Sequence, residues 1–345
     1  MKAEVVAMDA EHLNMEAIQK AGKILREGGL VAFPTETVYG LGGNALDPKA
    51  SMKIYAAKGR PSDNPLIVHI ADIKDLAKIT TEIPEGARIL AEKYWPGPLT
   101  MILPKADSVP KETTGGLDSV AVRFPSDRIA QELIKAAGGF VAAPSANTSG
   151  RPSPTMAEHV EEDLGDAIEM IIDGGQVGIG LESTIVDFTE DVPVVLRPGY
   201  ISLEMLKDTL GDVRMDRGLL ITDSSVHPKA PGMKYRHYAP NADVILVAGC
   251  DSDVEKYMFD RSDDSSVAFI CFDEYHKLAE CKNAVFIGSE CDLDQQARKI
   301  FDILREFDSQ PEIKTVYAKM PSQNGIGLAI YNRLLKAAGY RIIRI

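Results

Sequence analysis

The sequence predicts two α/β domains, the first built on a mixed sheet and the second on regularly alternating strands and helices. The chain has 345 residues, and globular chains of that length usually divide into domains of roughly 100–200 residues. Short apolar strands and helical segments are intermixed up to residue 200, whereas they alternate after residue 240, as in a Rossmann-like domain. We therefore expect domains at 1–210 and 241–345, joined by a linker at 211–240.

The elements of the first domain follow from apolar spacing and from flanking residues. Residues 12–28 place Leu13, Ile18 and Leu25 near helical spacing and end in a Gly-Gly pair, so they predict a helix. Pro48 starts the next helix, because proline is favoured at the first helical position. We expect helices at 48–57, 84–94, 127–137 and 155–164, strands at 30–33, 66–70, 99–103, 119–124, 140–143, 169–172, 183–188 and 193–197, and a loop at 34–42.

The linker and the second domain differ from this pattern. Residues 211–240 show no clear period and are interrupted by proline and glycine, which is typical of a linker. The segments after it predict strands at 243–248, 266–271, 284–287 and 315–318 and helices at 252–260, 293–307 and 324–338.

The charge pattern favours a small anionic ligand over nucleic acid. The net charge is −13, yet residues 1–150 carry 17 Lys and Arg against 18 Asp and Glu, whereas residues 151–200 carry 2 against 11. An acidic chain repels nucleic acid unless its cations are concentrated in a patch.

Cysteine and apolar patterns indicate a cytoplasmic protein without a metal site of its own. The four cysteines, Cys250, Cys271, Cys281 and Cys291, lack the spacing of a zinc site, so we expect free thiols. No apolar run reaches the length of about 18 residues that a membrane helix needs, and acidic residues interrupt the N-terminal segment, unlike a secretory signal.

The loop at 58–65 is the first candidate site. Lys58 and Arg60 stand one residue apart beside Ser62 and Asn64, in a segment that Gly59 and two prolines keep out of a helix. Such a group of cations and hydrogen-bonding side chains suits a triphosphate, although an ordinary charged loop explains it equally well. The chain has no GxxxxGK[ST], GxGxxG, HExxH or GxSxG motif.

Polar side chains at other strand ends could have either a structural or a ligand-binding role. Ser145 and Asn147 are either ligand-binding residues or turn formers. His69 ends an apolar strand, where a buried core histidine is the more common role. Arg123 lies either on a solvent-exposed face or against a carboxylate, which it can bind through two hydrogen bonds. Thr35 and Thr37 are expected to lie on alternate sides of an extended segment, so that at most one of them faces a given pocket.

Six short sequence motifs occur in a fixed order in the first two hundred residues. They are PTETVYGL, KGRPSDNPLIVHI, WPGPLT, VAVRFP, APSANTSG and ESTIVD. In this order and spacing, residues 10–210 resemble the YrdC family of threonylcarbamoyl-AMP synthases, and the PGMKYRHYAP linker with the C-terminal module resembles its longer, two-domain form. The resemblance implies a twisted mixed sheet with a concave positive surface, followed by a Rossmann-like domain.

The function implied is that of a nucleotidyltransferase. Such an enzyme condenses L-threonine, bicarbonate and ATP into threonylcarbamoyl-AMP and pyrophosphate, for the threonylcarbamoyladenosine modification of tRNA. The resemblance implies Mg²⁺ carried with ATP rather than a protein metal site, a separate downstream tRNA threonylcarbamoyl transferase, and no requirement for tRNA contact.

The resemblance also assigns residues to roles. The signature residues carried over as catalytic are Lys58, Arg60, Ser145 and Asn147. ATP would be bound by Arg60, Asn64, Ser119, Ser145, Ser153, Arg197 and Arg236. Threonine would be bound by Thr37, His69, Arg123, Ala143 and Ser183. We further hypothesise that residues 231–238 close over the pocket as a lid.

Three other functions compete with this interpretation of the sequence. An RNA-binding protein could use the same concave surface, but the chain is acidic and lacks an RNA-recognition motif. A hydrogenase-maturation carbamoyltransferase would carry zinc-finger cysteines, which this chain lacks. A structural scaffold would not need Lys58, Arg60, Ser145 and Asn147 together in strand-end loops.

Overall fold

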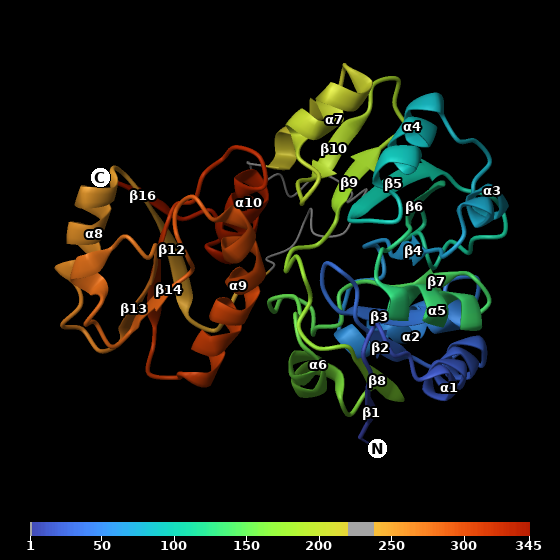
Figure 1. The fold of residues 1–345 in the computed structure, drawn as a ribbon, viewed down its shortest axis with the longest axis horizontal. Helices are drawn as coiled ribbons and strands as arrows, with labels where there is room; N and C mark the ends of the chain where they lie inside the picture. Colours follow the sequence, from blue (N-terminus) through green and yellow to red (C-terminus); the bar gives the residue numbers. More distant parts are fainter. Residues whose placement is uncertain (1, 220–237) are drawn as a thin grey trace. The chain divides into compact units, whose positions relative to one another are not determined.

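The computed structural model describes residues 2–219 and 238–345. Its contacts divide the chain into two compact units, the first comprising Met1–Ser149 and Ser153–Lys234 and the second Gly150–Pro152 and Tyr235–Ile345. Figure 1 shows the mixed sheet of the first unit and the parallel sheet of the second. The mixed α/β fold class predicted from the sequence is confirmed, while most of the predicted linker lies outside the described residues.

The first unit is built on an 11-stranded mixed sheet. Its strand order is β1-β8-β2-β3-β7-β4-β6-β5-β9-β10-β11. The strands are β1 (Glu4–Ala7), β2 (Val31–Phe33), β3 (Gly40–Asn44), β4 (Ile67–His69), β5 (Leu99–Pro104), β6 (Ser119–Arg123), β7 (Val141–Ala142), β8 (Met170–Asp173), β9 (Thr184–Asp187), β10 (Val194–Arg197) and β11 (Arg214–Met215). The helices are α1 (Met15–Arg26), α2 (Pro48–Lys58), α3 (Leu76–Ile79), α4 (Glu85–Tyr94), α5 (Arg128–Ala136), α6 (Ala157–Leu164) and α7 (Leu203–Leu210), with 3₁₀ turns η1 (Ile73–Asp75) and η2 (Arg217–Leu219).

Strands β2 and β8 of this sheet are buried on both faces. Val31 and Phe33 of β2 pack in one apolar cluster with α1 and α5 residues, whereas Ala32 packs in another cluster with residues of α2, α4 and α6. Because successive strand residues point to opposite faces, the two clusters lie on opposite sides of the sheet. β2 and β8 therefore read as continuous apolar runs, as strands covered on both faces do.

The expectation of a loop throughout 34–42 was wrong, because its end enters strand β3. Gly40, Gly42 and Gly43 of this strand face bulky neighbours: an added Cβ on Gly42 would lie 3.0 Å from both Phe33 Cε1 and Val141 Cγ1. Glycine is therefore required by close packing. A glycine-rich stretch resembles a loop in the sequence, so its composition concealed the strand.

The second unit has a five-stranded parallel sheet of order β14-β13-β15-β12-β16. Its strands are β12 (Asp243–Ala248), β13 (Val267–Cys271), β14 (Ala284–Phe286), β15 (Thr315–Lys319) and β16 (Ile342–Arg344). Its helices are α8 (Asp251–Phe259), α9 (Leu293–Glu306) and α10 (Gly327–Ala337), with 3₁₀ turns η3 (His276–Leu278) and η4 (Phe307–Ser309). The alternation predicted after residue 240 is thus present, although the strand order differs from the usual doubly wound order.

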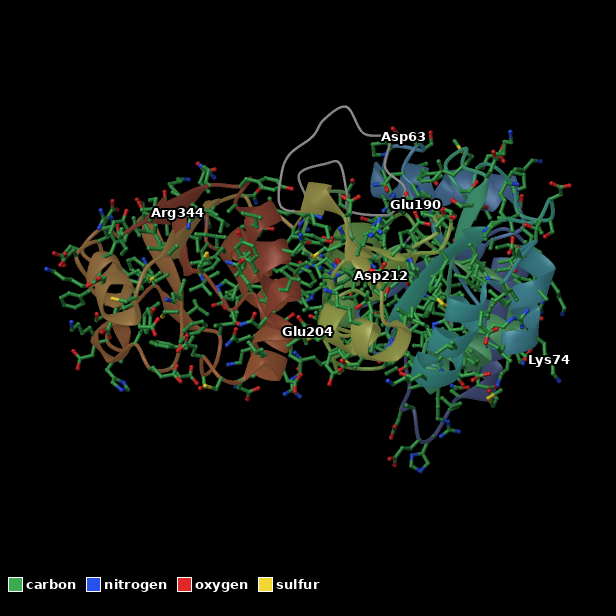
Figure 2. All side chains as sticks on the ribbon, turned by 90° about the horizontal axis from the view of Figure 1, so that it is seen from above. Asp63, Lys74, Glu190, Glu204, Asp212 and Arg344 are labelled. Atoms are coloured by element: carbon green, nitrogen blue, oxygen red, sulfur yellow. The ribbon has the colours of Figure 1, made fainter. Side chains whose placement is uncertain are left out.

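Charged side chains lie on the surface of the first unit. Figure 2 shows the described side chains, and the exposed acidic residues that it labels include Glu190, Glu204 and Asp212. Among the described helices, none has both the length and the apolar character that crossing a bilayer requires.

Candidate active site

The structure brings the end of α2 against the loop after β7. Gly59 ends the helix in the left-handed conformation, at φ 60°, which glycine adopts without strain. Lys58 is only 2% exposed, and its ammonium group donates to the carbonyl oxygens of Ser145 and Asn147. The Ser149 N–H donates to the Lys58 carbonyl at 2.8 Å. Three signature residues, far apart in the sequence, therefore meet at one place.

Arg60 and Asn64 stiffen the neighbouring loop. The Arg60 guanidinium donates to the carbonyl oxygens of Asn64, at 3.2 Å from Nη2, and of Pro65, at 3.0 Å. Asn64 is 2% exposed, and its Oδ1 has no hydrogen-bond partner among the described residues. A buried acceptor of this kind is usually satisfied by water or a ligand.

Ser145 and Asn147 lie in a bend of the chain that their own side chains stabilise. The Ser145 hydroxyl donates to Asn147 Oδ1 at 2.6 Å, and Asn147 Nδ2 donates to the Thr148 carbonyl at 2.8 Å. The Ala146 N–H donates to the Tyr39 carbonyl at 2.8 Å, which holds the turn against the start of β3. The two residues therefore shape the local backbone, which is compatible with a ligand-binding role.

The predicted threonine-binding residues form a row across the sheet. In the parallel pair β4–β6, His69 lies opposite Arg123, and in the antiparallel pair β5–β6, Arg123 lies opposite Thr100. The Ser183 hydroxyl lies 2.7 Å from that of Thr100. The Ala143 N–H donates to the carbonyl of Ile67 in β4 at 2.9 Å.

His69 is a buried, neutral histidine. It is 3% exposed, Nδ1 lies 3.2 Å from the Ile67 carbonyl oxygen, and the ring stands edge-on to Phe33. Burial, with a smaller contribution from the Arg123 charge, lowers the pKa of His69 to about 3. At neutral pH, His69 can therefore offer a neutral ring to a ligand but no positive charge.

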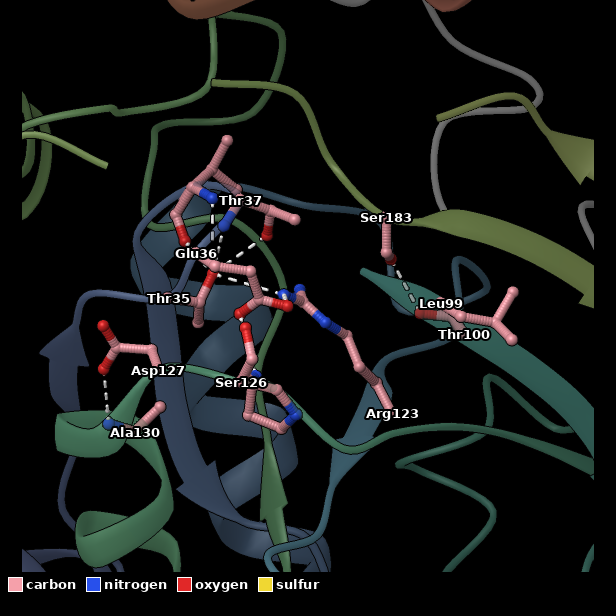
Figure 3. Close-up of polar contacts among 12 residues, drawn as sticks. Thr35, Glu36, Thr37, Leu99, Thr100, Arg123, Ser126, Asp127, Ala130 and Ser183 are labelled. Carbon is pink, nitrogen blue, oxygen red and sulfur yellow. Dashed lines mark hydrogen bonds and ion pairs between the residues drawn. The ribbon is translucent and has the colours of Figure 1, made fainter. Parts of the chain in front are cut away.

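Arg123 is buried and paired with Glu36. Its guanidinium Nη2 lies 2.8 Å from Glu36 Oε1, and the two side chains are 5% and 14% exposed. Figure 3 shows Arg123 reaching from β6 toward Glu36 and Thr35. Of the two alternatives left open by the sequence, the solvent-exposed one does not hold, and Arg123 lies against a carboxylate, that of Glu36.

Thr35 and Thr37 do not point apart as expected. Their hydroxyl oxygens lie 2.9 Å from each other, and Thr35 Oγ1 also accepts from the backbone N–H groups of Thr37 and Val38, at 3.2 and 3.3 Å. The expectation was wrong, because residues two positions apart share a face in an extended segment. The segment is also bent, since the Thr35 hydroxyl caps the N–H groups that follow it.

Arg197 and Ser153 are also tied to neighbouring side chains. Arg197 donates to the Ser183 carbonyl at 3.0 Å and to its hydroxyl at 3.2 Å. The buried Ser153 hydroxyl donates to Glu182 Oε1 at 2.5 Å. Arg197, assigned to ATP, thereby contacts Ser183, assigned to threonine, so the two predicted subsites meet where β9 begins and β10 ends.

One predicted site residue, Ser119, stands apart from these contacts, and another lies outside the described residues. Ser119 starts β6, whereas Arg123 ends it, so the two lie about 13 Å apart along an extended strand. Arg236, like the predicted lid at 231–238, lies outside the described residues. Within the described parts of the chain, no group of three His, Cys, Asp or Glu side chains is placed to hold a metal ion.

Sequence reasoning missed three polar residues of this region: Glu36, Thr100 and Glu182. Each is tied to a predicted residue, namely Arg123, Ser183 and Ser153. Glu36 and Glu182 fall inside the quoted motifs PTETVYGL and ESTIVD. An acidic residue inside an otherwise apolar or neutral motif was the signal from which Glu36 and Glu182 could have been predicted.

Comparisons with known proteins cover the whole chain. A family model of the Sua5/YciO/YrdC type, described as telomere recombination, matches residues 23–199, and a model described as the C-terminal domain of threonylcarbamoyl-AMP synthase matches residues 201–339. A threonylcarbamoyl-AMP synthase of Pyrococcus abyssi is 46% identical, covering 97% of this chain and 98% of the relative. One of Bacillus subtilis is 45% identical, covering 96% and 95%. A crystal structure of P. abyssi Sua5 complexed with L-threonine matches with a TM-score of 0.92 at 44% identity, covering 100% of both chains.

Proposed function

This chain belongs to the Sua5/YciO/YrdC family, and we infer that it is an L-threonylcarbamoyladenylate synthase of the two-domain form. The observation that carries this inference is the match over 97% of the chain to a threonylcarbamoyl-AMP synthase at 46% identity. The resemblance recognised from six sequence motifs is thereby confirmed. We propose that the substrates are L-threonine, bicarbonate and ATP and that the product serves tRNA modification.

The chemistry requires charge neutralisation and alignment. The threonine nitrogen is first carboxylated, and the resulting N-carboxylate attacks the α-phosphorus of ATP while pyrophosphate leaves. Nucleophile and target are both anionic, so positioned cations and N–H groups lower the barrier most. Lys58 and Arg60 would bind the triphosphate oxygens, because Lys58 is the last residue of α2 and Arg60 lies in the loop that follows it. Mg²⁺ would arrive with the triphosphate, held by phosphate and water.

The neutral polar groups would complete the nucleotide site. Ser145, Asn147 and Ser153 follow β7 in one loop, and Asn64 Oδ1 is buried without a partner among the described residues. We propose that these groups bind ATP together with Arg197. The predicted roles of Ser119 and Arg236 remain proposals of the same kind.

The threonine site would use the row of residues across the central strands. Arg123 would bind the carboxylate, while Thr37, His69, Ser183 and the Ala143 backbone would surround the rest of the molecule. All of these residues are at most 5% exposed, which suits a site that excludes water from a labile mixed anhydride. The lid at 231–238, the cytoplasmic location and the downstream transferase stay predictions.

Pyrophosphate release tests this function. We expect release that requires ATP, bicarbonate and L-threonine together, and that falls by roughly a hundredfold in Lys58→Ala and Arg60→Ala, as loss of a charge-stabilising group does. Lys49→Ala is the matched control, because Lys49 lies on the same helix with an exposed side chain. Turnover that is independent of threonine would contradict the substrate assignment.

A further inference from the structure

Glu36 and Arg123 form a buried ion pair with unused hydrogen-bonding capacity. The pair is close, at 2.8 Å between Glu36 Oε1 and Arg123 Nη2. Nevertheless, among the described residues, Glu36 Oε1 receives no well-aligned hydrogen bond and Arg123 Nε donates none. Buried donors and acceptors are rarely left in this state in a complete site. An acceptor oxygen of Glu36 and a donor nitrogen of Arg123 are therefore both left without a hydrogen bond among the described residues.

The surroundings hold both groups in place. The Ser126 N–H donates to Glu36 Oε2 at 3.3 Å, and the Glu36 carbonyl accepts from the Ile179 N–H at 2.9 Å. Arg123 Nη2 also lies 3.5 Å from Thr35 Oγ1. Figure 3 shows the support of the pair from β6 and from the bend before β3. The segment after β8 adds the Ile179 contact.

Charge balance limits what can bind there. A ligand carboxylate at Arg123 would place two carboxylates on one buried guanidinium, and nearby like charges disfavour each other. His69 adds no compensating charge, because its pKa is lowered to about 3. Asp127 caps α5 by accepting from the Ala130 N–H at 2.9 Å and adds no positive charge. A ligand must therefore bring its own cation close to its carboxylate.

We propose that Glu36 binds the ammonium group of L-threonine through Oε1 while Arg123 binds its carboxylate through Nε. An α-amino acid carries its ammonium and carboxylate on one carbon, so it can satisfy both unused groups of the pair without a net change of charge. The proposal rests on the proposed function and assigns Glu36 as a substrate-binding residue that selects amino acids over other carboxylic acids.

The same contact has a consequence for the reaction. When the ammonium form reacts with bicarbonate, an N–C bond forms, and water and one proton are released to solvent, leaving an N-carboxylate. The nitrogen then carries no positive charge, and Glu36 repels the new carboxylate. The repulsion directs the N-carboxylate away from Glu36, toward the cations that would neutralise the triphosphate.

The test compares two ligands that differ only at the α-substituent: L-threonine and 2,3-dihydroxybutanoate of the same configuration. Calorimetry on the full-length protein should show that the wild type binds threonine more tightly. In Glu36→Gln, threonine affinity should fall by roughly tenfold or more, the usual effect of truncating one partner of a buried charged contact. Affinity for the hydroxy acid should stay the same or rise, because the internal carboxylate no longer competes for Arg123.

Controls separate this role from a structural one. Glu36→Asp keeps the charge and should keep the preference for threonine, while Asp127→Asn removes a neighbouring carboxylate, preserves the helix cap and should also keep it. If Glu36→Gln keeps the wild-type preference, or loses both ligands equally, the inference is overturned. If the wild type binds no threonine, that result contradicts the proposed function itself rather than the role of Glu36.

Discussion

At the scale of single residues, burial rather than residue type decides what each polar group can do. Lys58, His69 and Arg123 are all at most 4% exposed. Lys58 is held by backbone carbonyls and Arg123 by a carboxylate, whereas His69 loses its charge. Unpaired buried charge is expensive, so each residue has been given a partner or a neutral state.

The neutral state of His69 makes stability depend on pH. Its pKa is lowered from 6.5 to about 3 in the folded chain, so between these values the unfolded chain binds more protons. Stability is therefore complete above about pH 6.5 and falls as the pH decreases. At about 1.4 kcal/mol per pH unit, His69 contributes a loss of about 2 kcal/mol between pH 7 and pH 5.

Urea unfolding of the wild type and of His69→Asn at pH 7 and pH 5 measures this contribution. We expect the wild type to lose more stability than the variant between these pH values, because asparagine has no proton to bind. Other groups titrate equally in both proteins and cancel in the difference. Equal losses would show that the pKa of His69 is the same in the folded and the unfolded chain.

Some site residues could be predicted from the sequence and others could not. The convergence of Lys58 with Ser145 and Asn147 was expected and is present. Glu36 was not singled out, because no periodicity governs a bend whose direction is set by Thr35 hydrogen bonds to Thr37 and Val38. The motif positions were readable from the sequence, but the direction of a side chain in such a bend was not.

At the scale of secondary-structure elements, most bounds could be predicted because apolar spacing is strong where a face is buried. The helix expected at 48–57 is Pro48–Lys58, and the strand expected at 99–103 is Leu99–Pro104. The missed elements have weak patterns. β1 has no fully buried residue, and α7 buries only Leu206, so neither leaves a clear period in the sequence.

β3 was missed for a different reason, and this leads to a prediction at the element scale. Gly42→Ala should destabilise the chain by about 1–3 kcal/mol, as overpacking a core does. The added Cβ would lie 3.0 Å from Phe33 and Val141 and 3.1 Å from the Val31 carbonyl oxygen. The neighbours belong to β2 and β7, so the strand cannot move away from one without meeting another.

Gly178→Ala is the matched control for urea unfolding. The nearest atom to an added Cβ there is the Glu36 carbonyl oxygen at 4.0 Å, an ordinary contact. We expect this variant to unfold within about 0.5 kcal/mol of the wild type, as most unstrained substitutions do. Equal stability of the two variants would mean that β3 tolerates side chains, so that close packing would not explain its glycines.

At the scale of the whole molecule, the alternation of elements predicts the kind of fold but not the strand order. Both units have the expected α/β character, yet β15 lies between β12 and β13 in the second sheet. Which strands become neighbours depends on long-range packing, which local periodicity does not encode. The sequence likewise carried no signal that Gly150–Pro152 belongs with the second unit.

The placement of Gly150–Pro152 ties the second unit to the candidate nucleotide loop through the chain itself. Within that unit, Arg305 of α9 is 5% exposed and donates to the Pro152 carbonyl at 2.6 Å, and Arg151 pairs with Asp308 at 3.2 Å. In the sequence, the segment lies directly between Ser149 and Ser153. Loosening it should therefore disturb the proposed ATP-binding residues on either side.

Arg305→Met tests this link in the full chain. Methionine fills much of the same space but removes the donor from the Pro152 carbonyl, a loss of about 0.5–1.5 kcal/mol for one hydrogen bond. We expect KM for ATP to rise by roughly two- to tenfold, the range to which that energy converts, with KM for threonine unchanged. Arg298→Met, an exposed position on the same helix, should leave both constants at the wild-type values. Equal increases in both constants for Arg305→Met would indicate general destabilisation, and no change in either would show that the loop is ordered by the first unit alone.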